Sequence, residues 1–123
     1  MNVIPFPLPA RPELAILLDR VQQGDAAALI EAVAAWHAGM HWTPRRGGDI
    51  GAARANALYD VAEAIALAPA RCLDGLSAKI TFADLALCQG ADYPWERQLL
   101  QSIRSAFNAL CPSAAAALRG LDA

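Results

Sequence analysis

Two histidines, His37 and His41, stand four residues apart in a segment whose apolar pattern predicts a helix. This spacing can place both imidazoles on one helix face, where they could hold one metal ion. Gly39 lies between them and is expected to end or loosen the helix, and the sequence marks no third ligand. We therefore expect an edge histidine, a loop histidine and no bound metal or other cofactor, with this pair as the metal candidates.

The segment from His41 to Asp49 is rich in glycine, proline and arginine, which predicts a loop. Asp49 can cap the following helix, and the free amides at a helix N-terminus favour anions. A small anionic ligand or a nucleotide could bind here, with Trp42 stacking on a base, although a flexible capped turn accounts for the same residues. The candidate ligand-binding residues are Trp42, Arg45, Arg46, Gly47 and Gly48.

Two charged residues, Arg54 and Asp84, are the best candidates for buried charges, and Arg54 falls inside the apolar stripe of its predicted helix. The short connection between the two helices that carry them indicates an antiparallel hairpin, which would bring the start of one near the end of the other. We expect a buried, structural ion pair between Arg54 and Asp84. No second carboxylate or base accompanies Asp84, which disfavours a catalytic role.

The three cysteines, Cys72, Cys88 and Cys111, lack the spacing of a zinc knuckle or a disulfide framework. Cys72 follows Arg71 and precedes a helix, where a thiol can become reactive, but the sequence places no histidine beside it. Cys88 and Cys111 lie on apolar stripes and are expected in the core. The sequence also shows no Ser-His-Asp order and no paired-carboxylate motif, so we predict that the protein is not an enzyme.

Helical periodicity runs through most of the chain, and no segment alternates in the manner of a strand. The sequence predicts a single all-α domain over residues 1–123: a five- or six-helix orthogonal or antiparallel bundle with an extended, proline-rich N-terminal arm at residues 1–11. The first and second helices, and the third and fourth, should form hairpins, with the fifth closing the core. The expected helices cover about residues 12–23, 25–39, 49–68, 73–89, 94–111 and 113–119.

Self-association is the expected use of two apolar features. The arm is too apolar to stay in water, so it should lie across the helices of its own or a neighbouring subunit; a PxxP ligand at Pro9 to Pro12 is the less specific alternative. The helix over residues 73–89 has two apolar faces and should be either the most enclosed or at a subunit contact. The expected interface residues are Phe6, Leu8, Phe82 and Leu85.

Composition limits the classes of partner. Charged residues make up 18% of the chain and the net charge is −2, without a basic cluster, so nucleic acid is not an expected partner. No apolar run reaches the roughly 18 residues that span a bilayer, and prolines interrupt the N-terminus where a secretory signal would lie. We expect a soluble cytoplasmic protein that does not enter membranes.

The run from Ile65 to Lys79, IALAPARCLDGLSAK, resembles a segment of small uncharacterised all-helical bacterial proteins that are often prophage-associated. The resemblance covers about fifteen residues, and Cys72 replaces the threonine or serine usual before the helix. It implies a bacterial cytoplasmic origin and a helix-turn-helix-like hairpin in which Gly75 allows close approach and Lys79 faces outward. That family has no established activity, so the resemblance implies no catalytic or binding residue.

These observations favour a noncatalytic protein-interaction or structural module that forms a homodimer or binds an unknown protein partner. One alternative is the binding of an anionic ligand or a nucleotide at residues 42–49. A second is a phage-type transcriptional regulator, which requires a basic recognition helix that neither the fourth nor the fifth predicted helix supplies.

Overall fold

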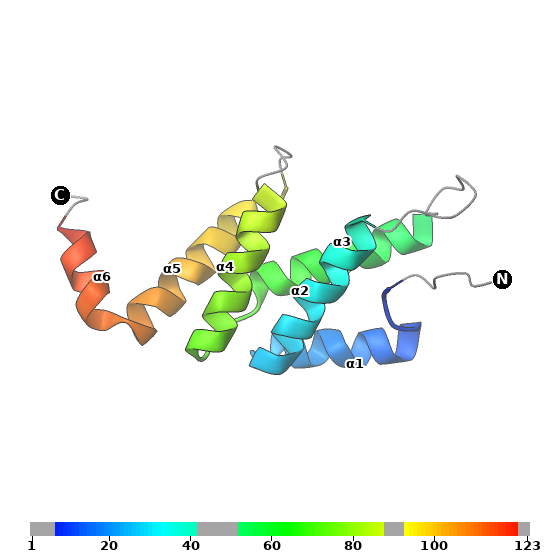
Figure 1. The fold of residues 1–123 in the computed structure, drawn as a ribbon, viewed down its shortest axis with the longest axis horizontal. Helices are drawn as coiled ribbons and strands as arrows, with labels where there is room; N and C mark the ends of the chain where they lie inside the picture. Colours follow the sequence, from blue (N-terminus) through cyan, green and yellow to red (C-terminus); the bar gives the residue numbers. More distant parts are fainter. Residues whose placement is uncertain (1–6, 42–51, 88–92, 121–123) are drawn as a thin grey trace.

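The computed structural model describes residues 7–41, 52–87 and 93–120, and all regular structure in these ranges is helical. The prediction of an all-α bundle is confirmed, and the helix bounds stay close to the expected ones (Figure 1). The helices are α1 (Arg11–Gln22), α2 (Ala26–His41), α3 (Ala52–Leu67), α4 (Leu73–Leu87), α5 (Glu96–Leu110) and α6 (Pro112–Arg119). Residues 1–6 of the predicted arm lie outside the described ranges.

Asp25 starts α2 as an N-cap. Its Oδ1 accepts hydrogen bonds from the amides of Ala27, at 3.0 Å, and Ala28, at 3.3 Å, which satisfies donors that have no partner inside the helix. Arg20, near the end of α1, binds the other carboxylate oxygen with its Nη2 at 2.9 Å. The Arg20 hydrogen bond is the main cause that lowers the pKa of Asp25, with the amides of Ala28 and Ala27 adding to it. This one side chain therefore fixes the turn between α1 and α2.

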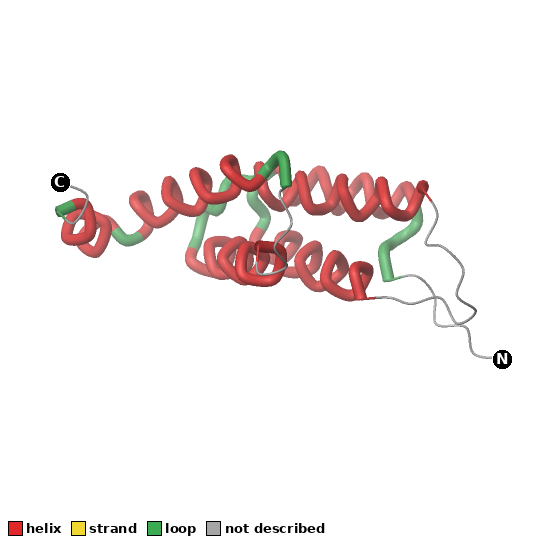
Figure 2. Tube along the Cα trace, turned by 90° about the horizontal axis from the view of Figure 1, so that it is seen from above, coloured by secondary structure: helices red, strands yellow, loops and turns green. Residues whose placement is uncertain are grey.

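The helices pack in an order that the hairpin prediction only partly anticipates. Through α5, each helix contacts the next one and the next but one, and the most extensive contact joins α2 to α4. These two helices run side by side in the same direction (Figure 1), and in the view from above they form one layer while α3 and α5 form another (Figure 2).

The predicted α3–α4 hairpin is therefore wrong as the main packing unit. α3 packs mainly on α1, α2 and α5 and only slightly on α4. Phe82 of α4 contributes to the contact with α2, since it packs edge-on against Trp36, with ring centroids 4.8 Å apart. Edge-to-face aromatic pairs of this kind add to the stabilisation that burial of the rings provides.

The two connections, α1–α2 and α3–α4, lie against each other. Arg71 Nε donates a hydrogen bond to the Gln23 carbonyl at 2.9 Å, across 48 positions of sequence. Gly24 has a φ of +81°, and a Cβ there would lie only 2.9 Å from the Pro69 carbonyl oxygen. Glycine is thus required both for the left-handed backbone and for the close approach of the second connection.

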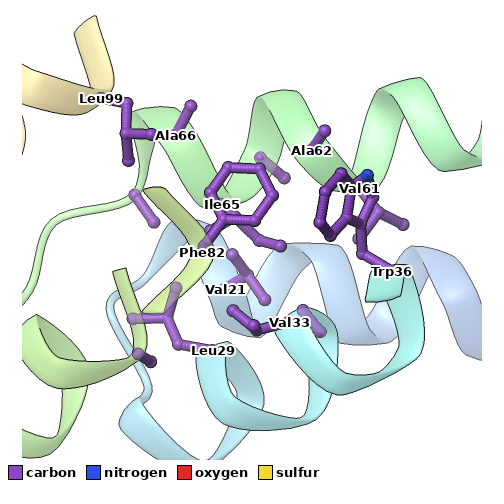
Figure 3. Packing of buried hydrophobic residues seen from close by; sticks show 14 of the residues in the cluster. Val21, Leu29, Val33, Trp36, Val61, Ala62, Ile65, Ala66, Phe82 and Leu99 are labelled. Atoms are coloured by element: carbon purple, nitrogen blue, oxygen red, sulfur yellow. The ribbon is translucent and has the colours of Figure 1, made fainter. Parts of the chain in front are cut away.

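The core lies where α1 to α5 meet, and Figure 3 shows its central side chains. Phe82 is fully buried between Trp36 and Trp95 of α2 and the start of α5, with 5.2 Å between the Phe82 and Trp95 centroids. The largest other side chains that are fully buried are Val21, Leu29, Val61, Ile65, Lys79 and Leu99. Unlike the first five helices, α6 contacts only α5 among the described helices (Figure 1).

Candidate functional site

A groove runs between α2 and α4 on the surface of the bundle. Its volume is about 360 Å³, and apolar side chains make most of its walls. Ile30 of α2 stands on its rim with 52% of its surface exposed. The residues that line the groove are Ile30, Val33, Ala34, His37, Asp74, Ser77, Ala78, Thr81 and Leu85.

The two ends of the groove carry different polar groups. Because α2 and α4 are parallel, their first turns meet at one end, where Ile30 lies with Asp74, and their later turns meet at the other, where His37 lies with Leu85. The Thr81 hydroxyl donates to the Ser77 carbonyl of its own helix, at 2.9 Å. The groove therefore has an apolar floor, a carboxylate at one end and an imidazole at the other, a geometry suited to holding an apolar segment.

His37 and His41 lie next to each other at the end of α2, with ring centroids 4.5 Å apart and both side chains exposed. The expectation that Gly39 ends the helix is wrong, because α2 continues to His41. Gly39 instead faces α3, where a Cβ would come within 2.4 Å of the Leu58 Cδ2. Within the described ranges, no group of three or more histidine, cysteine, aspartate or glutamate side chains could hold a metal ion.

Lys79, the one lysine in the sequence, is fully buried, so the outward position implied by the resemblance is wrong. Its ammonium donates to the carbonyls of Ala66, at 3.0 Å, and Ala68. Carbonyls at a helix C-terminus lack intrahelical partners and carry partial negative charge, which a cation satisfies. Burial lowers the pKa of Lys79 to about 8. This side chain therefore connects the end of α3 to α4 by hydrogen bonds.

A signal for the burial of Lys79 was present in the sequence. The residue lies on α4 four positions after Gly75 and three before Phe82, on the same face as these two buried residues. The residue type opposes this signal, because lysine is almost never fully buried without partners. The carbonyl partners come from α3, so only the fold reveals them.

The predicted burial of Arg54 and Asp84 is wrong, since both side chains are exposed. Both residues take part in interactions, so whether they bind each other stays a prediction. The reason for the error is the packing of α3, which turns its buried stripe toward α1, α2 and α5 and leaves only a small contact with α4.

The predicted interface residues fall in different places. Phe82 is fully buried in the core of its own chain, so its assignment to an interface is wrong. Leu8 of the arm is partly buried against the same core, which means that this part of the arm packs on its own helices. Leu85 lines the α2–α4 groove and remains available to a partner. Phe6 lies outside the described residues.

The other predicted sites are only partly covered by the structure. Trp42, Arg45, Arg46, Gly47 and Gly48 all lie outside the described ranges, so the anion-binding loop stays a prediction. Cys88 also lies outside them, whereas Cys72 is exposed. The expectation that Cys111 is core is wrong: its side chain is half-buried, because it stands at the break between α5 and α6.

Comparisons with known proteins do not assign the chain to a family: no family model, no curated protein and no solved structure matches it. Across the described residues, none of the helices has both the length and the apolar character needed to cross a bilayer. The arguments for function therefore depend on the α2–α4 groove and the side chains around it.

Proposed function

We propose that this chain is a noncatalytic interaction module that forms a homodimer through the α2–α4 groove. The observation that supports this most is the groove itself, an apolar channel with the exposed side chain of Ile30 on its rim, a carboxylate at one end and an imidazole at the other. A large apolar side chain beside an apolar groove is self-complementary, which is the requirement of a two-fold interface.

The position of the polar residues supports a second copy as the occupant. A two-fold axis perpendicular to the groove would lay the Asp74 end of one copy over the His37 end of the other, twice in each dimer. Imidazole and carboxylate can then form a charge-assisted hydrogen bond at each end. The same operation would bring Ile30 of one copy toward Leu85 of the other, so apolar contact and charge favour the same arrangement.

The composition agrees with this proposal. Only 18% of the residues are charged, against about 25% in an average soluble domain, which leaves less charge to solvate the outer helix faces. In the proposed dimer the exposed side chain of Ile30 becomes buried against the second copy, which removes apolar surface from water.

Light scattering at tens of micromolar protein tests the proposal, with a dimer expected. Ile30→Glu should raise the dissociation constant by at least about tenfold, because it places a carboxylate in the apolar groove. Ile16→Glu is the matched control: Ile16 is also exposed, at 62%, but lies on α1 away from the groove, so this variant should remain a dimer. A monomeric wild-type chain, or equal effects of the two variants, would overturn the proposal.

A charge exchange tests the relative orientation of the two copies. His37→Glu should weaken the dimer by opposing two carboxylates at each end of the groove. Adding Asp74→Lys to that variant should restore it, since a carboxylate then faces an ammonium at each end. If the double variant is weaker than the single one, the two-fold arrangement is incorrect.

A further inference from the structure

The end of α2 carries three side chains that can bind a soft metal ion: His37, Met40 and His41. At about 100° per residue, the positions i, i+3 and i+4 fall on one side of a helix. Both histidines are exposed. Met40 is 38% exposed, although an apolar methionine would make more contacts in the core. All three side chains therefore face solvent from the same turn.

The backbone of that turn is held in place from its opposite side. Gly39 is buried against Leu58 of α3, at a distance that no other residue type would allow without displacing the leucine. The helix consequently continues through Gly39, and the two imidazoles come together with centroids 4.5 Å apart and ring planes tilted by 59°. Two imidazoles one helical turn apart can bind a single metal ion, which approaches each ring nitrogen to about 2.0 Å.

We propose that His37, Met40 and His41 form a copper(I) site. Imidazole nitrogen binds copper, zinc and nickel, whereas the thioether of methionine is a soft ligand that selects copper(I) among them. Two nitrogens and one sulfur complete a three-coordinate site on a single helix. The site depends on α2 and its packing on α3, and it does not require the proposed dimer.

Competition against a chromogenic copper(I) chelator under anaerobic conditions, on the full chain, tests the site. His41→Ala should weaken copper(I) binding on the order of tenfold or more, and Met40→Leu should also weaken it. Nickel(II) is the second probe: His41→Ala should reduce its binding while Met40→Leu leaves it unchanged. Neither variant alters a residue that lines the groove, but His37 does line it, so all variants are compared at one protein concentration with their oligomeric state measured alongside. Glu31→Ala, an exposed position on the same helix, serves as the matched control.

The three cysteines are the competing ligands, and a Cys72→Ser/Cys88→Ser/Cys111→Ser variant separates their contribution. Copper(I) binding that survives in this variant supports the site, and binding lost in it but retained in His41→Ala overturns the proposal. If the triple variant does not fold, proton NMR of the two imidazoles in the unmodified chain shows whether the histidines bind copper(I). Both imidazole signals must change when copper(I) is added at one equivalent, and unchanged signals overturn the site.

Discussion

The two faces of α4 differ from what residue type alone suggests: a lysine is buried on one face, and a leucine and an isoleucine are exposed on the other. On the inner face, the lysine Lys79 and the aromatic Phe82 are both fully buried. On the outer face, Leu73 and Ile80 are 61% and 49% exposed. The neighbouring helices account for this difference in burial, because α2, α3 and α5 cover the inner face, while α6 makes no contact with α4.

The inner face accepts a lysine because α3 ends beside it. The carbonyls of Ala66 and Ala68 give the ammonium two acceptors, which offsets part of the cost of removing it from water. The outer face accepts leucine and isoleucine because scattered exposed apolar side chains cost a folded protein little. Four substitutions along α4 test this contrast.

The largest effect should come from removing a ring on the inner face. Phe82→Ala should lower the free energy of unfolding by about 3–5 kcal/mol, since it leaves a cavity between Trp36 and Trp95. Ile80→Ala, on the outer face, should change it by less than about 1 kcal/mol. Urea denaturation followed by circular dichroism, at one fixed protein concentration, measures both. Similar losses for the two variants would refute the contrast between the faces.

The buried lysine should make stability depend on pH. Its pKa is about 8 in the folded chain and 10.5 ordinarily, so between these values the unfolded chain holds a proton that the folded chain has lost. Stability should therefore rise as pH increases from about 8 to 10.5, by up to about 3 kcal/mol. Lys79→Met keeps the length of the side chain and should remove this rise.

Thermal unfolding of both proteins across that pH range provides the measurement. The difference between them isolates Lys79 from the tyrosines, which titrate near 10. A pH profile that is the same for wild type and Lys79→Met would show that the lysine stays charged inside the fold.

The smallest effect should come from Gly75, where the resemblance implied a need for close approach. A Cβ at Gly75 would lie 3.6 Å from the nearest atoms of Ala70 and Leu29, which is ordinary contact. Gly75→Ala should therefore stabilise the chain by about 0.5–1 kcal/mol through helix propensity. Gly24→Ala gives the opposite control, because its φ of +81° and a 2.8 Å approach to Arg71 Nε make any side chain destabilising there. A loss of stability in Gly75→Ala would mean that α4 needs the glycine after all.

Local signals account for the part of the fold that the sequence predicted well. Asp25 caps α2 through its own carboxylate, and Pro12 and Pro112 stand in the first turns of α1 and α6. These devices act within a few residues, so the helices and their approximate ends can be read without knowing the fold. The apolar stripe of α5 around Leu99 is local in the same sense.

The candidate sites were harder to predict, because each depends on contacts between distant segments. Gly39 looks like a helix break in sequence, but Leu58 of α3 packs on it and α2 continues, which brings His37 and His41 together. The α2–α4 groove has no sequence signal, since its walls come from two helices separated by the whole of α3.

The sequence by itself determined an all-helical chain and the approximate extent of its helices. Only the tertiary structure decided which face of each helix is covered, that α4 pairs with α2 more than with α3, and that Lys79 is buried while Leu73 is exposed. The physical reason is the distance along the chain over which each effect acts. Helix formation depends on hydrogen bonds and side chains a few residues apart, whereas burial depends on which distant surfaces exclude water from each other.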